Sequence, residues 1–374
     1  WEQRKLDNVA EFSKGRGYSK GDLIELGTPI ILYGRLYTNY ETSISDVDTY
    51  VEAKDGSVYS RGGEVIVPAS GESAEDIARA ATVDKSGILL GGDLNVVMPN
   101  EDINSGFLAI SISNGNPQRE LAKRAQGKSV VHIHNEEIRN LRVPFPIKVE
   151  QNKIVEYFFN LDHLITLHQR KCEETKSLKK YMLQKMFPEN GKCVPEIRFS
   201  GFSDDWEQRK LDNVAEFSKG RGYSKGDLIE LGTPIILYGR LYTNYETSIS
   251  DVDTYVEAKD GSVYSRGGEV IVPASGESAE DIARAATVDK SGILLGGDLN
   301  VVMPNEDINS GFLAISISNG NPQRELAKRA QGKSVVHIHN EEIRNLRVPF
   351  PIKVEQNKIV EYFFNLDHLI TLHQ

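Results

Sequence analysis

A basic loop near the start of the chain carries side chains suited to binding phosphate. The segment Phe12–Lys20 holds three cations, two glycines, one tyrosine and no acidic residue. Glycines let a backbone approach phosphate groups closely, and Lys and Arg supply the positive charge. A solvated turn is the alternative interpretation. The candidate residues are Lys14, Arg16, Tyr18 and Lys20, which recur later in the chain as Lys219, Arg221, Tyr223 and Lys225.

An alternating pattern follows in the segment Tyr33–Tyr40. Arg35, Tyr37 and Asn39 stand on alternate positions, so an extended backbone would place all three on one face. Arg binds guanine and Asn binds adenine through paired hydrogen bonds in the major groove of DNA. A cross-strand aromatic ladder with a surface arginine explains the pattern equally well. The second copies of these residues are Arg240, Tyr242 and Asn244.

Three weaker candidates for phosphate contact lie further along the chain. Two are Gly- and Ser-rich loops, and the third is a helix that carries Arg119, Lys123 and Arg124 before the run Gly127–Ser129. A P-loop would need a glycine where Ala122 stands, so that interpretation fails. A solvated surface is the alternative for all three. The candidates are Arg61, Ser70, Arg124 and Lys128, with second copies at Arg266, Ser275, Arg329 and Lys333.

The sequence gives little indication of a metal site or of catalytic residues. His132 and His134 would share one strand face near Glu136, but zinc needs a third or fourth ligand, so we expect two hydrogen-bonded histidines. The sequence has no Asn/Asp-Pro-Pro-Tyr/Phe, Gly-x-Ser-x-Gly or His-Glu-x-x-His motif, and Glu75 and Asp76 are typical of a helix start. We therefore expect no enzyme activity, metal or cofactor in this chain.

A long internal repeat organises the chain. Residues 1–169 reappear without a mismatch as residues 206–374, at an offset of 205, and only residues 170–205 occur once. Each copy is long enough to bury its own core, so we expect two domains. Recent duplication, recombination or engineered fusion explains such identity better than two copies under separate selection.

The charge and cysteine content limit the classes of protein that fit. The net charge is −10, and the unique segment carries eight Lys or Arg and six Asp or Glu, which leaves −6 for each copy. DNA binding by such an acidic module must therefore rest on local basic loops. Both cysteines, Cys172 and Cys193, lie in the unique segment, which excludes a disulfide scaffold within the copies. No long apolar run or signal peptide is visible, and we expect a cytoplasmic protein.

The pattern of one copy predicts a mixed α/β or α+β globule with many loops. Short runs of β-branched residues predict the strands, and Gly-rich punctuation separates the elements. The expected strands are 29–33, 64–67, 87–90, 94–97 and 130–134. The expected helices are 74–81, 105–113 and 117–125.

Each copy ends in a different kind of segment. After Val143–Pro146, seam-compatible residues recur in steps of four and three, which is typical of a heptad helix. The helix continues less regularly to Phe187, where Pro188 stops it, and its length is about 55 Å. The seam residues are Ile154, Phe158, Leu161, Ile165, His168, Cys172 and Thr175. The second copy starts the same seam, and we expect the two helices to pair antiparallel.

The flanks of this helix carry a characteristic series of segments: Ile138–Pro146, Glu150–Ile154, Leu161–Ile165, Leu183–Pro188, Pro195–Phe202 and Asp205–Leu211, in that order. This series resembles the specificity (S) subunits of type I restriction–modification systems. The resemblance covers nearly the whole chain and is strongest in the spacer. S subunits usually carry two different recognition domains, whereas here they are identical, and the second helix stops at Gln374.

The resemblance implies a division of labour. Residues 1–146 and 206–351 would be target recognition domains that each bind half of a split DNA site. Residues 147–187 and the truncated 352–374 would be spacer helices, joined through the linker 188–205. Two methyltransferase subunits and restriction subunits would dock on this chain and hold the S-adenosylmethionine, ATP and Mg²⁺. The alternative is a coiled-coil scaffold that dimerises other proteins without binding DNA.

Overall fold

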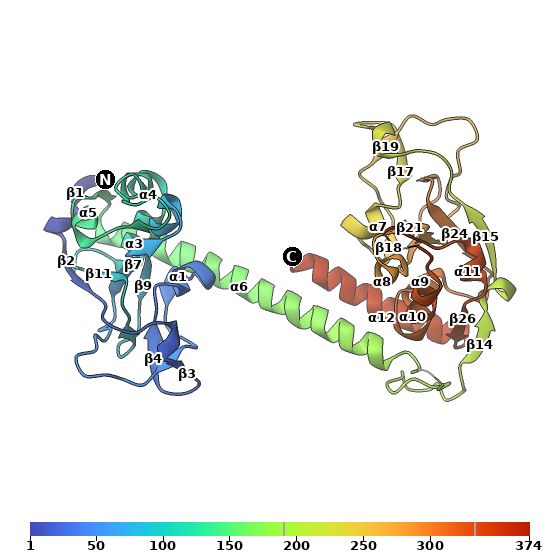
Figure 1. Cartoon of the computed structure of the whole chain (residues 1–374), viewed down its shortest axis with the longest axis horizontal. Helices are drawn as coiled ribbons and strands as arrows, with labels where there is room; N and C mark the ends of the chain where they lie inside the picture. The colour runs from blue at the N-terminus through green and yellow to red at the C-terminus, as the bar shows by residue number, and fades with distance from the viewer. Residues whose placement is uncertain (190, 333) are drawn as a thin grey trace. The chain divides into compact units, whose positions relative to one another are not determined.

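The computed structural model describes residues 1–374 except 190 and 333, and it divides into two compact units, Trp1–Thr166 and Leu167–Gln374 (Figure 1). Each unit contains a mixed globule of short strands and helices, so the predicted α+β class is confirmed. A single long helix, α6 (Lys148–Lys185), contributes to both units. Among the described residues, no helix is long and apolar enough to cross a membrane.

The first unit contains thirteen strands and five short helices before α6. The strands are β1 Glu2–Lys5, β2 Ala10–Lys14, β3 Leu23–Ile24, β4 Thr28–Ile31, β5 Ser43–Ile44, β6 Tyr50–Val51, β7 Glu64–Pro68, β8 Ser70–Gly71, β9 Ala81–Val83, β10 Leu89–Leu90, β11 Leu94–Pro99, β12 Val131–His132 and β13 Arg142–Phe145. The helices are α1 Arg35–Thr38, α2 Ala74–Ile77, α3 Ser105–Ser113, α4 Gly115–Ala122 and α5 Asn135–Arg139, with 3-10 turns at Leu6–Asn8 and Lys20–Asp22.

A five-stranded sheet in the order β2-β11-β7-β9-β5 forms the centre of this unit. Successive side chains of a strand point to opposite faces of the sheet, and the side chains on both faces of β7 are buried. Val65 and Val67 pack with Phe107 of α3 in one apolar cluster. Ile66 packs in a second cluster with residues of the loops and strands on the other face. The near-continuous apolar run of β7 follows from this burial on both sides.

A smaller sheet and two strand pairs surround this centre. The four-stranded sheet has the order β10-β4-β6-β3, and the pairs are β1-β13 and β8-β12. The pair β1-β13 brings the first strand against the strand that leads into α6. Asn104 caps α3 by accepting the Phe107 amide at 3.1 Å. Gln151 of α6 accepts the Asn104 amide at 2.8 Å and donates to the Pro146 carbonyl at 2.9 Å, so it fixes the long helix to the globule.

The second unit repeats these elements. Its strands are β14 Glu207–Lys210, β15 Ala215–Lys219, β16 Leu228–Ile229, β17 Thr233–Ile236, β18 Ser248–Ile249, β19 Tyr255–Val256, β20 Glu269–Pro273, β21 Ser275–Gly276, β22 Ala286–Val288, β23 Leu294–Leu295, β24 Leu299–Pro304, β25 Val336–His337 and β26 Arg347–Phe350. Its helices are α7 Arg240–Thr243, α8 Ala279–Ile282, α9 Ser310–Ile317, α10 Gly320–Arg329, α11 Asn340–Arg344 and α12 Lys353–Leu372, with 3-10 turns at Leu211–Asn213 and Lys225–Asp227. The sheet orders match those of the first unit.

Several element boundaries differ from the sequence expectation. The helix expected over 74–81 ends at Ile77, because Ala81 is needed as the partner of Ile66 in the central sheet. The helix expected from Pro117 begins at Gly115, which leaves the proline in the first turn, where it is tolerated. The expected strands 29–33, 87–90 and 130–134 shorten to β4, β10 and β12.

The heptad segment forms the predicted long helix, and its second half pairs with α12 inside the second unit. Cys172 and Thr175 are buried. Lys179 forms an ion pair with Asp367, while His168 lies 2.9 Å from His373 between their Nδ1 atoms. Residue numbers therefore increase along α6 where those of the contacting residues decrease along α12, which confirms the antiparallel pairing.

Candidate nucleic-acid interface

The basic loop that follows β2 is held in a fixed shape. The amides of Gly15 and Arg16 donate to the carbonyls of Leu94 and Leu90, each at 3.0 Å. A Cβ at Gly15 would lie 2.0 Å from the Gly91 carbonyl oxygen, so only glycine lets the loop approach this closely. Gly17 and Tyr18 both adopt positive φ, near 60°. These backbone hydrogen bonds and close contacts fix the shape of the loop.

Tyr18 joins this loop to a second one, Lys54–Ser57. Its hydroxyl accepts the Lys54 amide at 2.7 Å and lies 2.6 Å from the Ser57 hydroxyl. The Lys54 ammonium lies 4.9 Å from the centre of the Tyr18 ring. Tyr18 therefore positions the two loops, and its hydroxyl is engaged within the protein.

The two loops together present four cations, which we call the basic tip: Lys14, Arg16, Lys20 and Lys54. All four are exposed. Lys54 forms an ion pair with Asp22, whose pKa is lowered to about 2, first by the hydrogen bond from Lys54 and then by those from Ser19. Within the described residues, Lys14, Arg16 and Lys20 form no ion pair. Their charge is therefore available to an anion.

Sequence reasoning missed Lys54. Its only signal was the turn sequence Lys54-Asp-Gly-Ser57, in which Gly56 has φ +76°. A Cβ at Gly56 would lie 3.2 Å from a guanidinium nitrogen of Arg16, which shows how closely the two loops pack.

The expectation that Arg35, Tyr37 and Asn39 share an extended face is wrong. Residues 35–38 form the helical turn α1, so alternate positions do not point the same way. The Arg35 side chain is 11% exposed and forms ion pairs with Glu41 at 2.8 Å and Asp48 at 2.9 Å. It thereby holds the loop that follows α1. Asn39 ends the turn and is exposed.

Tyr37 and Ser70 meet beside the strand pair β8-β12. The Tyr37 hydroxyl donates to the Ser70 carbonyl at 2.8 Å, and burial raises the pKa of Tyr37. The Ser70 hydroxyl lies 3.1 Å from Nδ1 of His132. The rings of His132 and His134 stack with centres 6.4 Å apart. Among the described residues, no group of three or more His, Cys, Asp or Glu is placed to hold a metal.

This histidine strand is continuous with the base of the basic tip. Asn135 donates to the Ser13 carbonyl at 2.8 Å, and Ser13 precedes Lys14. Gln126 forms an antiparallel β-bridge with His132. Arg124 stands two residues before this bridge and donates to the Glu137 carbonyl at 3.4 Å, while Lys128 is exposed beyond it. Hydrogen bonds and a β-bridge therefore connect the segments that carry Lys14, Ser70 and Arg124.

Arg61 lies apart from that group. It precedes β7, whereas Ser70 follows the same strand, and five residues of strand span about 17 Å. Its amide and that of Gly62 donate to the buried carboxylate of Glu64. The Arg61 side chain is exposed.

The second unit places its copies in the same way. Tyr223 joins the loops at Ser262 and Lys259, and Arg240 is paired with Glu246 and Asp253. Arg221 donates to the Gly261 carbonyl at 3.5 Å. Six of the remaining copies occupy equivalent positions in the matching elements, namely Lys219, Lys225, Tyr242, Asn244, Arg266 and Ser275. Arg329 is the last residue of α10, whereas Arg124 lies beyond the end of α4. Lys333 lies outside the described residues.

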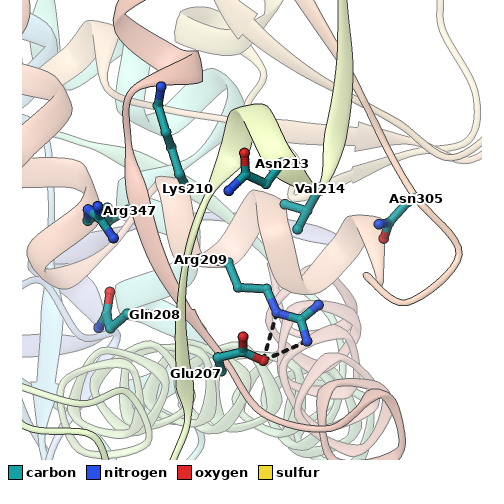
Figure 2. Close-up of a pocket in the computed structure, with 8 residues that line it drawn as sticks. All are labelled: Glu207, Gln208, Arg209, Lys210, Asn213, Val214, Asn305 and Arg347. Carbon is teal, nitrogen blue, oxygen red and sulfur yellow. Dashed lines mark hydrogen bonds and ion pairs between the residues drawn. The ribbon is translucent and has the colours of Figure 1, made fainter.

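A polar hollow of about 390 Å³ lies at the other end of β15 from the basic tip of the second unit (Figure 2). It opens where β14 pairs with β26, beside the strand that leads into α12. Three of its lining residues are cations, Arg209, Lys210 and Arg347, and Arg209 binds Glu207 through two nitrogens at 2.6 and 2.9 Å. Sequence reasoning did not identify this hollow, although the alternating run Glu207–Lys210 contributes most of its polar groups.

The family of the chain follows from comparison with known proteins. The model of the type I restriction modification DNA specificity domain matches residues 1–177 and again residues 203–374. The chain belongs to this family. The first match covers one globule and most of α6, and the second covers the other globule and all of α12, so the repeat is a repeat of the family's own domain.

Two curated relatives come from Methanocaldococcus jannaschii. The type I restriction enzyme MjaVIII specificity subunit is 22% identical over 77% of this chain and 69% of its own length. The putative type I restriction enzyme MjaX specificity subunit is 26% identical over 60% of this chain, which spans about half of that relative, 55%.

Solved structures of this family share the fold. The S subunit of a type I restriction–modification system from M. genitalium aligns over 100% of this chain and 91% of its own, with a TM-score of 0.65 and 14% identity. A structure described as the basis of complex assembly and conformational transition of the type I R-M system aligns over the same share of each chain, with a TM-score of 0.50 and 16% identity. At these identities the likeness establishes the fold of a specificity-domain protein.

Proposed function

We propose that this chain is the DNA-reading specificity subunit of a type I restriction–modification complex, and that it has no catalytic activity of its own. The single observation that carries the proposal is the duplicated family match, which accounts for both globules and both helices. The curated relatives are specificity subunits. A scaffold that does not bind DNA is not favoured, because it would not need the two exposed basic tips.

The domain boundaries follow from this assignment. Residues 1–146 and 206–351 would be the target recognition domains, and 147–187 and 352–374 the spacer helices, with 188–205 as the connection. Methyltransferase subunits would clasp the helices, and restriction subunits would join through them. S-adenosylmethionine, ATP and Mg²⁺ would be held by these partners, and the complex would act on DNA in the cytoplasm.

The basic tips are our candidates for backbone contact. The two loops of a basic tip hold exposed cations in a fixed shape, which suits phosphate binding. Lys54 is paired with Asp22 but exposed, and among the described residues no ion pair engages Lys14, Arg16 or Lys20. The segments that carry Ser70, Arg124 and Lys128 would extend this contact. Arg35 and Arg240 are less suited, because each is already neutralised by two carboxylates.

Removing one cation from each basic tip should weaken DNA binding. Arg16→Ala combined with Arg221→Ala should lower affinity for every sequence alike, and the slope of log affinity against log salt should fall by about one unit per lost phosphate contact. Fluorescence anisotropy titrations at several salt concentrations measure both. Arg35→Ala with Arg240→Ala is the matched control, with little change in salt slope expected. An unchanged slope for the Arg16 and Arg221 variant would contradict the assignment.

The purified chain should transfer no methyl groups. Incubated with DNA and radiolabelled S-adenosylmethionine, it should give counts equal to a blank, because its sequence lacks the Asn/Asp-Pro-Pro-Tyr/Phe motif of amino-methyltransferases. Adding methyltransferase subunits of the matching system should start transfer. Methylation by the chain alone would refute the non-catalytic assignment.

A further inference from the structure

The strand pair β14-β26 places two cations directly opposite each other. Lys210 of β14 is the partner of Arg347 of β26 in the antiparallel register, so both side chains lie on the same face of the pair. The first unit repeats this arrangement with Lys5 opposite Arg142. We call these residues the opposed cations. Like charges at directly opposite positions destabilise a strand pair, so the opposed cations weaken the pairing that they belong to.

The carboxylate beside the opposed cations is shared. Asp212 lies 3.6 Å from Lys210 and 3.4 Å from Arg344. Arg347 is exposed and forms no ion pair among the described residues. The first unit repeats these contacts at 3.7 and 3.5 Å around Asp7, the copy of Asp212. Three positive charges and one negative charge leave an excess of two positive charges in this cluster of each module.

The opposed cations of the second unit line a space with room for a ligand. Both belong to the polar hollow of about 390 Å³, which Asn213 also lines (Figure 2). Arg209 is turned to the other face of β14, where it binds Glu207. Lysine, arginine and asparagine side chains all donate hydrogen bonds to phosphate oxygens. The charge and the donors of the hollow therefore suit a phosphate group.

Strand β15 separates this hollow from the basic tip of the same module. Val214 lines the hollow and immediately precedes β15, and Lys219 of the basic tip is the last residue of the strand. Five residues of strand span about 17 Å. The major groove of DNA is about 12 Å wide and has one sugar-phosphate backbone on each side. Cations at the two ends of β15 are therefore far enough apart to contact two different backbones.

We propose that the opposed cations, Lys210 with Arg347 and Lys5 with Arg142, bind a phosphate of the DNA backbone in each module, in addition to the phosphate contacts of the basic tip. This inference rests on the proposed function, because it adds a second contact to the same duplex. The phosphate accepts hydrogen bonds from both cations and removes the repulsion between them. Phosphate contacts carry no sequence information, so the recognised bases do not depend on these residues.

Arg142→Gln combined with Arg347→Gln tests this contact in the full chain. The slope of log DNA affinity against log salt should fall by about two units, one for each lost phosphate contact. Arg4→Gln with Arg209→Gln is the matched control. It removes the same charge from the neighbouring strand, but from arginines that are already bound to a glutamate two residues earlier, so the slope should not change. Fluorescence anisotropy titrations with one DNA duplex at several salt concentrations measure both slopes.

Heat unfolding distinguishes DNA from free phosphate as the ligand. At low salt the Arg142→Gln and Arg347→Gln variant should unfold at a higher temperature than the natural chain, because the like-charge pairs are gone. Unfolding at a lower temperature would show that these cations stabilise the strand pair, against the proposal. Inorganic phosphate should shift both unfolding temperatures equally. A larger shift for the natural chain, together with an unchanged salt slope for the variant, would assign the hollow to free phosphate instead of DNA.

Three further results would overturn the proposal. They are an unchanged salt slope for the Arg142→Gln and Arg347→Gln variant, an equal fall for its control, and loss of methyltransferase binding with an unchanged slope, which would assign the cations to an acidic protein surface. The basic-tip variant separates this failure from failure of the proposed function. If Arg16→Ala with Arg221→Ala lowers the slope, only the second contact is wrong. If the natural chain binds no DNA, both proposals are wrong.

Discussion

Methylated sites produced by a complex containing this chain should form an interrupted palindrome. Each of the two identical modules would bind the same base sequence, in the same orientation relative to that module. We expect a half-site of roughly three to five base pairs, an unread spacer of roughly five to eight, and then the reverse complement of the half-site, with centres about one helical turn apart. Long-read sequencing of methylated DNA from cells that also express the methyltransferase subunits gives the motif directly.

The palindrome rests on the antiparallel helices. Each globule precedes the same helical sequence, and α6 and α12 run in opposite directions where they pair. We expect identical modules attached alike to antiparallel helices to be related by a two-fold axis when they bind DNA, and a two-fold axis perpendicular to DNA relates its two strands. A motif with direct repeats, or with two different half-sites, would contradict this. Replacing residues 206–351 with an unrelated recognition domain should change one half-site only.

Phe363→Ala should destabilise the second unit by about 4 kcal/mol, while Phe158→Ala should change the stability of the protein by less than about 0.5 kcal/mol. The two residues have identical sequence neighbours. Phe363 lies fully buried beneath Phe187, whereas Phe158 is 44% exposed, so only the first substitution leaves a cavity.

Urea unfolding followed by tryptophan fluorescence measures this difference, since Trp206 is buried in the same cluster. The chain has two units, so the transition that carries the Trp206 signal is the one to fit. Equal losses for the two variants would show that the helix pairing does not bury Phe363.

The sequence was sufficient for features that extend over many residues. The long helix was predicted because its apolar period persists over several turns. Cys172 and Thr175 of the expected seam are buried, whereas Phe158, Leu161 and Ile165 are exposed. Its antiparallel partner was predicted because a seam needs a second helix and only one other copy exists. The two domains followed from the repeat.

Features fixed by a few tertiary contacts were not predictable. Alternation of Arg35, Tyr37 and Asn39 suggested a strand, but Arg35 reaches Glu41 and Asp48, and this pairing stabilises a helical turn instead. No local pattern reports such partners. Similarly, Ala81 was assigned to the expected helix 74–81, although it pairs in the central sheet with Ile66, fifteen positions earlier.

The candidate interface also combines a feature that the sequence predicts with features that depend on tertiary contacts. The basic loop was identified from composition alone, and it remains our prediction for DNA contact. The positive φ of Tyr18 and its hydrogen bond to the Lys54 amide could not be foreseen, because both depend on a loop thirty-six residues away. Lys54 was missed for that reason.

The continuity of α6 has a consequence for how such a chain can change in length. The helix runs for 38 residues without a proline or glycine. Each inserted residue would therefore add about 1.5 Å and also turn everything beyond it by about 100°. Length and orientation cannot vary separately. Insertions near whole numbers of turns preserve the angle at which a downstream module faces its ligand, so workable variants should differ in discrete steps and intermediate lengths should be rare.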